Sequence, residues 1–370
     1  MKTPRPLPGI AEIAPYVPGK GSTHKGVWKL SANESALGAS PLAAAAFIDA
    51  AKSIHLYPDG DAADLKAAIA EVHGLRKDRL TIGSGSDELI SLIIRAYADG
   101  TDKVLYSRHG FSYYPVAAAA ALVGRLDARE ADLTIDVEAM IEAANDPAVK
   151  VVFIANPNNP TGTWLSSVEV RRLRSGLRSD VMLVLDGAYA EYIDDHAYSD
   201  GADLVTEAEA AGADNVIMIR TFSKIYGLGG LRVGWAYAPL SATDTLNRLR
   251  PPFNVGGPSL KAAEAAVRDQ AFVAENKAFT DKERRRVAKG LGALGYKVRE
   301  TATNFVLFEA PGATQEDRDR EAQRLIDHLE TEGVLVRSPK SSGLIGYLRV
   351  TIGPAEANDD FLAAMAAATR

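Results

Sequence analysis

Four short segments carry the residues whose types and spacing suit chemistry: GSGSDE (83–88), NPNNPTG (156–162), DGAYAEY (186–192) and RTFSKIYGLGGLRVG (220–234). Each comes at the end of a short apolar run that is typical of a buried strand. Ligands of open parallel sheets bind at the carboxyl ends of the strands, so the four segments are expected to meet at one edge. Taken singly, each segment is weak evidence for a ligand site; GSGSDE, for example, lacks the third glycine of a dinucleotide-binding fingerprint.

The side chains in these segments are compatible with a covalently held, anionic ligand. Lys224 follows a predicted strand and precedes a glycine-rich turn that permits close approach, so its amine can form an imine. Asp186 ends the apolar run VMLVLD (181–186). Ser86 begins a predicted helix, whose free N–H groups suit a phosphate, and Arg232 offers a bidentate cation. The ordinary alternatives are a solvated lysine, a turn aspartate and a surface arginine.

In this order and spacing the four segments resemble the pyridoxal 5'-phosphate (PLP)-dependent aminotransferases of fold type I (class I/II). The resemblance is greatest to the histidinol-phosphate branch, which shares segments like APYVPG (14–19), SANESALG (31–38), YPDG (57–60) and YLRVTIG (347–353). It extends nearly from end to end of the chain. Two positions depart from the family pattern: Phe111 stands where a tyrosine is commoner, and Gly187 replaces an acidic residue that often follows the motif aspartate.

The resemblance implies a role for each matching residue. Lys224, Asp186 and Tyr189 would be catalytic, with Asp186 keeping the pyridine nitrogen of PLP protonated. Phe111 would stack on the ring of PLP, and Asn159 would donate to its 3'-oxygen together with Tyr189. The cofactor phosphate would be bound by Gly85, Ser86, Asp87, Thr221, Ser223 and Arg232, and by Tyr57 of a neighbouring subunit. The substrate would be bound by Tyr16, Asn33, Arg337 and Arg349.

Composition narrows the remaining classes of function. The 370 residues carry a net charge of −6, which disfavours nucleic acid and anionic membranes as partners and favours small molecules. Cysteine is absent, so disulfides and thiolate chemistry are excluded. Six scattered histidines without HxH or HExxH spacing predict no metal site, and His109 is given no role. With no long apolar stretch and no signal-peptide pattern, a cytoplasmic protein is expected.

The pattern of apolar runs predicts an α/β protein with a mostly parallel central sheet and a smaller α+β domain. Residues 1–30 are expected to form an extended arm with turns that joins the small domain, residues 31–250 the large PLP-binding domain, and residues 251–370 the small domain. A Pro/Gly break at 249–259 separates the two, and one long helix is expected near 260–294. The resemblance also implies a homodimer with shared active sites.

The resulting hypothesis is reversible transamination between histidinol phosphate and 2-oxoglutarate in histidine biosynthesis. Fold and cofactor motifs are common to related enzymes, so two alternatives stay open. One is an aromatic amino acid aminotransferase, and the other is a PLP-dependent decarboxylase of a phosphorylated amino acid. A PLP-sensing regulator is disfavoured, because no basic helix-turn-helix segment precedes residue 30.

Overall fold

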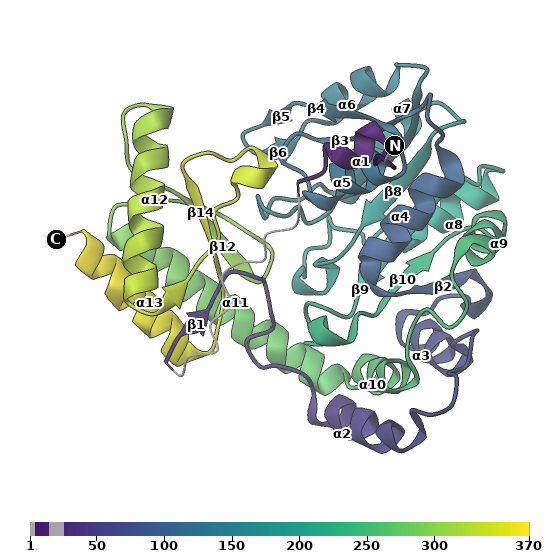
Figure 1. The fold of residues 1–370 in the computed structure, drawn as a ribbon, viewed down its shortest axis with the longest axis horizontal. Helices are drawn as coiled ribbons and strands as arrows, with labels where there is room; N and C mark the ends of the chain where they lie inside the picture. The colour runs from purple at the N-terminus through teal and green to yellow at the C-terminus, as the bar shows by residue number, and fades with distance from the viewer. Residues whose placement is uncertain (1–3, 15–25, 370) are drawn as a thin grey trace.

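The chain folds around two sheets with a long helix between them (Figure 1). The structure is a computed structural model, and it describes residues 4–14 and 26–369. Tyr16, one of the predicted substrate residues, lies outside these ranges. Among the described helices, none combines the length and apolarity that crossing a membrane requires.

The larger sheet has seven strands in the order β2-β10-β9-β8-β7-β3-β4. Their bounds are β2 (Leu80–Gly83), β10 (Gly234–Tyr237), β9 (Val216–Thr221), β8 (Met182–Asp186), β7 (Val149–Ala155), β3 (Lys103–Ser107) and β4 (Gly124–Ala128). Only β10 in this sheet runs antiparallel to its neighbours, so the predicted mostly parallel sheet is confirmed. Every side chain of β8 and β9 is buried, as expected for strands covered on both faces.

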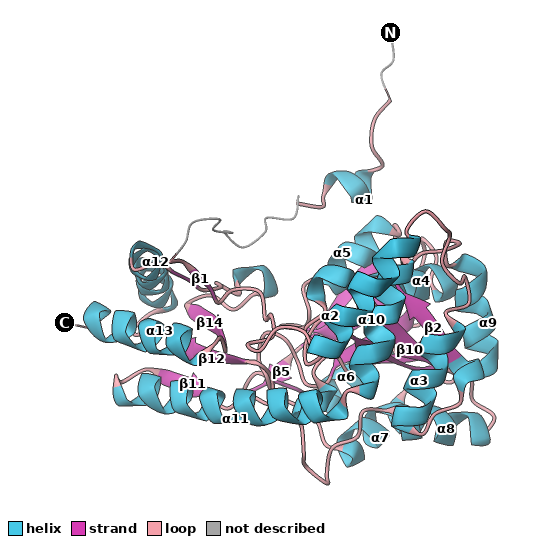
Figure 2. Ribbon diagram, turned by 90° about the horizontal axis from the view of Figure 1, so that it is seen from below, coloured by secondary structure: helices cyan, strands magenta, loops and turns pink. Residues whose placement is uncertain are grey.

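Helices cover both faces of this sheet (Figure 2). One face is covered by α4 (Gly85–Tyr97), α5 (Tyr113–Ala120) and α9 (Leu240–Leu249). The other face is covered by α3 (Ala63–His73), α6 (Val137–Ala144), α7 (Ser167–Gly176), α8 (Ala202–Ala210) and α10 (Gly257–Arg268), with α2 (Pro41–Ala50) packed against α10. The hairpin β5 (Glu130–Ala131) and β6 (Thr134–Ile135) lies outside the main sheet.

The smaller unit is built on an antiparallel sheet of β11 (Lys297–Arg299), β12 (Phe305–Glu309) and β14 (Tyr347–Thr351). Its helices are α11 (Gln270–Ala293), α12 (Gln315–Thr331) and α13 (Ala355–Ala368). The strand β1 (Trp28–Lys29) pairs in parallel with β13 (Val334–Leu335), and Leu30 enters the same core. The described end of the predicted N-terminal arm therefore packs with the smaller unit.

Two local expectations were wrong. The long helix predicted near 260–294 is two helices, because the side chain of Asp269 accepts a hydrogen bond from the amide of Phe272 and starts α11. The arm is also not wholly extended, since α1 (Pro8–Ala11) forms one helical turn against α5. Because α10 packs in the larger core, the domain boundary predicted at residue 250 is better placed, as a proposal, within α11.

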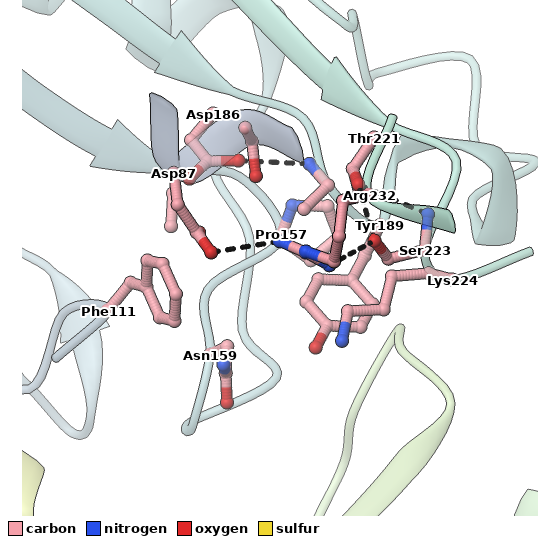
Figure 3. A pocket seen from close by; sticks show the side chains of 13 residues that line it. Asp87, Phe111, Pro157, Asn159, Asp186, Tyr189, Thr221, Ser223, Lys224 and Arg232 are labelled. Carbon is pink, nitrogen blue, oxygen red and sulfur yellow. Dashed lines mark hydrogen bonds and ion pairs between the residues drawn. The ribbon is translucent and has the colours of Figure 1, made fainter. Parts of the chain in front are cut away.

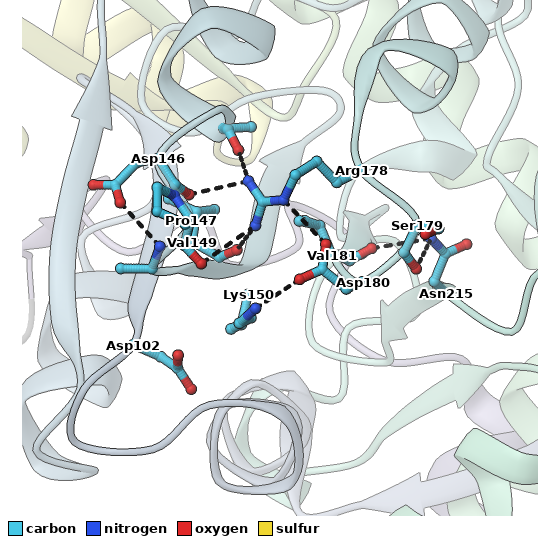
Figure 4. Close-up of polar contacts among 12 residues, drawn as sticks. Asp102, Asp146, Pro147, Val149, Lys150, Arg178, Ser179, Asp180, Val181 and Asn215 are labelled. Atoms are coloured by element: carbon cyan, nitrogen blue, oxygen red, sulfur yellow. Dashed lines mark hydrogen bonds and ion pairs between the residues drawn. The ribbon is translucent and has the colours of Figure 1, made fainter.

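One half-buried junction beside the larger sheet involves Arg178 (Figure 4). Its guanidinium donates to the carbonyls of Ala144, Asp146 (3.0 Å) and Val149 (2.8 Å), and its Nε binds the carboxylate of Asp180. These carbonyls belong to the turn between α6 and β7, where the backbone leaves the helix. The arginine thus adds a charged donor to carbonyls where the backbone leaves the helix, although the carbonyl of Asp146 also accepts from the amide of Val149 at 2.9 Å.

We predict that Arg178→Met lowers the free energy of unfolding by about 2 to 4 kcal/mol, because several carbonyls lose a charged donor at once. Chemical denaturation of the two proteins measures the change. The matched control is Arg172→Met, which removes only an exposed ion pair with Glu138 and should cost under about 1 kcal/mol. Equal losses in both variants would contradict the role given to Arg178.

Candidate active site

The predicted segments meet in one pocket at the carboxyl edge of the larger sheet (Figure 3). It is lined by Ser86, Asp87, Phe111, Ala155, Pro157, Asn159, Asp186, Ala188, Tyr189, Thr221, Ser223, Lys224 and Arg232. The strands β2, β3, β7, β8 and β9 all end at this edge. Ten of the lining residues belong to the predicted cofactor set, and Gly85 of the same set adjoins Arg232.

A cationic cradle closes one end of the pocket. Nη2 of Arg232 lies 3.0 Å from Oδ2 of Asp87, and Nη1 donates to Oγ of Ser223 at 3.2 Å. Gly85 starts α4 with φ +78°, and a Cβ there would come within 2.5 Å of Nη2 of Arg232. Only glycine leaves room for the guanidinium beside the helix N-terminus, where an anion would meet free N–H groups.

At the other end Asp186 is buried with neutral partners. Tyr114 donates its hydroxyl hydrogen to Oδ2 at 2.8 Å, and the amide of Ala188 donates to Oδ1 at 3.2 Å. Burial raises the pKa of Asp186 to about 6, and the hydrogen bond from Tyr114 opposes this rise. A cationic group bound beside this carboxylate would therefore be stabilised by an unscreened charge.

Lys224 and Tyr189 lie between these two ends. Nζ of Lys224 is 5.7 Å from the centroid of the Tyr189 ring. The hydroxyl of Tyr189 accepts a hydrogen bond of 2.7 Å from Nδ2 of Asn33. Asn33 is thus buried behind Tyr189 and does not line the pocket, so its predicted substrate contact stays a prediction.

Arg349 adjoins the pocket from the smaller unit. Its guanidinium donates to Oδ1 of Asn159 and to the carbonyl of Ser31, and it lies over the ring of Phe305. Arg337 follows β13, and its backbone pairs with that of Arg349 in an antiparallel bridge. Residues directly opposite in such a bridge project to the same face. The structure therefore brings together two arginines that are twelve positions apart in the sequence.

Tyr57 does not reach the pocket of its own chain. It is 84% exposed and stacks on Phe253 with 4.8 Å between the ring centroids. Its predicted contact with a cofactor would have to be made in another subunit, and this stays a prediction.

Sequence reasoning missed Tyr114, which is fully buried and holds Asp186. No sequence signal distinguishes Tyr114 from the adjacent Tyr113, because only the fold shows which ring faces β8. It also missed Glu130, which binds both the backbone amide and Nδ1 of His109 at 3.0 and 2.9 Å. The space beside Gly187 is filled by Arg220, whose Cδ would lie 3.0 Å from an added Cβ.

Comparisons with known proteins show the family of this chain. Residues 25–365 match the family described as aminotransferase class I and II. The chain is 44% identical to the histidinol-phosphate aminotransferase of Paramagnetospirillum magneticum, over 99% of this chain and 98% of the other. It is 46% identical to the enzyme of the same name from Jannaschia sp., with 98% of each chain covered.

Solved structures of PLP-dependent enzymes share the fold of this chain. The histidinol-phosphate aminotransferase of Sinorhizobium meliloti in complex with PLP superposes with a TM-score of 0.90 and 27% identity, over 100% of this chain and 98% of the other. A threonine-phosphate decarboxylase from Porphyromonas gingivalis, at 21% identity and a TM-score of 0.74, shares the fold. The chain belongs to the class I and II aminotransferases, a family of PLP-dependent enzymes of fold type I.

The pocket fits the cofactor of this family. PLP combines a phosphate, an aldehyde and a basic pyridine nitrogen, and the pocket offers a cationic cradle, a lysine amine and a buried carboxylate in that order. The Asp186 carboxylate is held by neutral partners, so a pyridinium nitrogen could pair with its negative charge. Within the described residues no cluster of acidic or histidine side chains suits a metal ion.

We predict a pH-dependent difference between the cofactor-free protein and its Asp186→Asn variant. The pKa of Asp186 is raised from 3.8 to about 6, so the folded chain binds this proton more tightly than the unfolded chain. The free energy of unfolding of the wild type should then fall, relative to the variant, by up to about 3 kcal/mol as the pH rises from about 4 to about 6.

Chemical denaturation of both cofactor-free proteins at several pH values measures this difference. Bound PLP should abolish it, because a cation beside the carboxylate lowers the pKa again. If the difference in free energy of unfolding between the two cofactor-free proteins does not change with pH, the pKa of Asp186 is not raised and the prediction is wrong.

Proposed function

We propose that this chain is a histidinol-phosphate:2-oxoglutarate aminotransferase of histidine biosynthesis that uses PLP. The observation that carries the proposal is the pairing of Arg337 with Arg349 beside the pocket, which offers two cationic sites for two anionic substrates. The names of the relatives, at 44% and 46% identity over nearly whole chains, support it.

When bound, PLP supplies an electron sink that stabilises negative charge at the substrate Cα. Asp186 would keep the pyridine nitrogen protonated, and Tyr189 with Asn159 would donate to the 3'-oxygen. Phe111 would stack on the ring, as Phe retains the apolar face of the commoner Tyr. Lys224 would hold the cofactor covalently, and its released amine would move the proton away from the substrate Cα.

The cofactor phosphate would lie in the cradle at the start of α4. Its oxygens would accept from the N–H groups of Gly85 and Ser86 and from the hydroxyls of Thr221 and Ser223, with Asp87 holding Arg232 in place. Arg232 would supply the main positive charge. A planar guanidinium is suited to bind two phosphate oxygens at once, which lysine is not.

The two paired arginines would divide the substrate contacts. Arg349, held by Asn159 and Ser31, would bind the carboxylate of glutamate or 2-oxoglutarate. Arg337 would bind the phosphate of histidinol phosphate, and the resemblance assigns Tyr16 and Asn33 to the substrate as well. One site would then accept both partners of a ping-pong reaction, because a guanidinium fork fits either anion.

The active form would be a cytoplasmic homodimer with shared sites. Residues 42–57 leave a run of apolar side chains more than half exposed, namely Leu42, Ile48, Ile54, Leu56 and Tyr57. Contiguous exposed apolar surface is typical of protein interfaces. Burial of this surface against a second copy would bring Tyr57 to the phosphate cradle of that copy.

We predict that histidinol phosphate and glutamate each convert the bound cofactor to pyridoxamine phosphate, observed as the loss of its yellow absorbance. Lys224→Ala should abolish both half-reactions. Arg337→Ala should lower kcat/KM for histidinol phosphate by roughly ten- to a hundredfold while leaving that for unphosphorylated histidinol nearly unchanged.

The control variant is Arg349→Ala, which should mainly damage the glutamate half-reaction. A wild type that prefers phenylalanine or tyrosine to histidinol phosphate would replace the proposal by an aromatic amino acid aminotransferase. Release of carbon dioxide from a phosphorylated amino acid without formation of pyridoxamine phosphate would replace it by a decarboxylase.

We predict that shared sites can be detected by mixing two inactive chains. Co-expression of Tyr57→Ala with Lys224→Ala should restore up to about a quarter of the wild-type activity, since half of the dimers are mixed and each has one intact site. Each variant expressed alone is the control. No recovery in verified mixed dimers would contradict the placement of Tyr57 in the neighbouring site.

A further inference from the structure

The helix α11 connects the two cores of the molecule. Its first half packs on the larger core through Val273, and its second half enters the smaller core through Val287 and Leu291. Figure 2 shows it running beneath the smaller unit and reaching the near side of the larger one. The helix is continuous over 24 residues, so one element carries contacts with both cores.

Asn276 lies in the half of this helix that faces the larger core, and its side chain is completely buried. Its Nδ2 donates to the carbonyl of Ile225 at 2.6 Å and to Oγ of Ser35 at 2.9 Å. Both amide hydrogens are therefore used. A buried amide is stable only with such partners, so the position of α11 and that of the Ile225 carbonyl are linked.

Ile225 is the residue after Lys224, and the turn that holds both is tightly confined. The amide of Gly227 donates to the carbonyl of Lys224 at 2.9 Å. A Cβ on Gly227, which has φ +69°, would overlap the carbonyl oxygen of Gly38 at 1.9 Å. Ser35 donates in turn to the carbonyl of Gly38 at 3.0 Å. The segment 35–38 thus packs closely on the turn that contains Lys224, and its Ser35 contacts Asn276 of α11.

The next residue of the helix reinforces this arrangement. Nζ of Lys277 lies 2.7 Å from carboxylate oxygens of both Asp194 and Asp281. Asp194 follows the 3-10 helix Ala190–Tyr192, which begins directly after Tyr189. One turn of α11 therefore contacts the chain just beyond both Lys224 and Tyr189.

We propose that Asn276 is a positioning residue that fixes the backbone of Lys224 and makes the position of its amine depend on α11. This rests on the proposed function, since it assumes that Lys224 carries PLP. Without the hydrogen bond to Ile225 the turn has room to shift, and displacements of about 1 Å cost up to a hundredfold in rate when reacting groups must be aligned.

The test compares two ligands of the cofactor-free dimer. PLP must react with the Lys224 amine, whereas pyridoxamine phosphate uses the same cradle without forming that bond. In Asn276→Leu, which is similar in size but has no donor, covalent attachment of PLP should slow at least tenfold. Binding of pyridoxamine phosphate, measured by calorimetry, should stay within about threefold of wild type, within the spread expected where no contact is lost.

Asn215→Leu is the matched control. Asn215 is also buried, and its Nδ2 donates to the carbonyls of Ser179 and Val181, which lie just before β8 and not on α11. This variant should change neither attachment of PLP nor binding of pyridoxamine phosphate. Asn276→Asp keeps the size of the side chain and removes its donors, so it should show the same split as Asn276→Leu.

Wild-type attachment rates in both Asn276 variants would overturn the proposal. Equal loss of both ligands, or failure of both variants to fold, would also overturn it and assign Asn276 to stability alone. Failure of this proposal differs from failure of the proposed function. If the proposed function is wrong, the wild type attaches PLP but does not transaminate histidinol phosphate.

Discussion

Burial of the Asp186 carboxylate is the constraint on which the site depends. The end of β8 is covered on both faces, and the described partners of Asp186 are a tyrosine hydroxyl and a backbone amide, both neutral. A carboxylate in such surroundings is costly until a cation joins it. The larger sheet thus holds a site with a preference for positive charge at its base. A phosphate at the opposite end would meet Arg232 and the start of α4, so the two ends of the pocket would suit opposite ends of one cofactor.

The antiparallel strand β10 makes it possible for Arg232 and Asp186 to lie at opposite ends of the same pocket. Because β10 runs antiparallel to β2 and β9, its first residues lie at the edge where the other strands finish. Arg232 precedes β10 by two residues and so faces the start of α4. A parallel strand in this place would have sent the arginine to the far edge. Gly85 and Gly234 then allow the close approach, since a Cβ on Gly234 would lie 2.6 Å from the amide nitrogen of Ser86.

The sequence predicts the parts that depend on local pattern. Buried strands appear as apolar runs, and the residues that end them, such as Asp186 and Thr221, fall at one edge of any parallel sheet. Contacts between distant segments are not visible in this way. The position of Asn33 behind Tyr189, the partner Tyr114 and the bridge between Arg337 and Arg349 all depend on packing. The break at Asp269 was missed because charged and alanine-rich helical pattern continues on both sides of a single capping residue.

The bridge between Arg337 and Arg349 is formed by backbone atoms, so it holds whichever side chain stands at residue 337. Arg349 is fixed by Asn159, Ser31 and the ring of Phe305, whereas the register at residue 337 demands nothing of its side chain. Residue 337 can therefore change without disturbing the strand pairing or the contacts of Arg349. Under the proposed division of substrate contacts, the scaffold keeps the contacts shared by all amino donors apart from those that distinguish them, so substitutions at residue 337 would give a short mutational route from one donor to another.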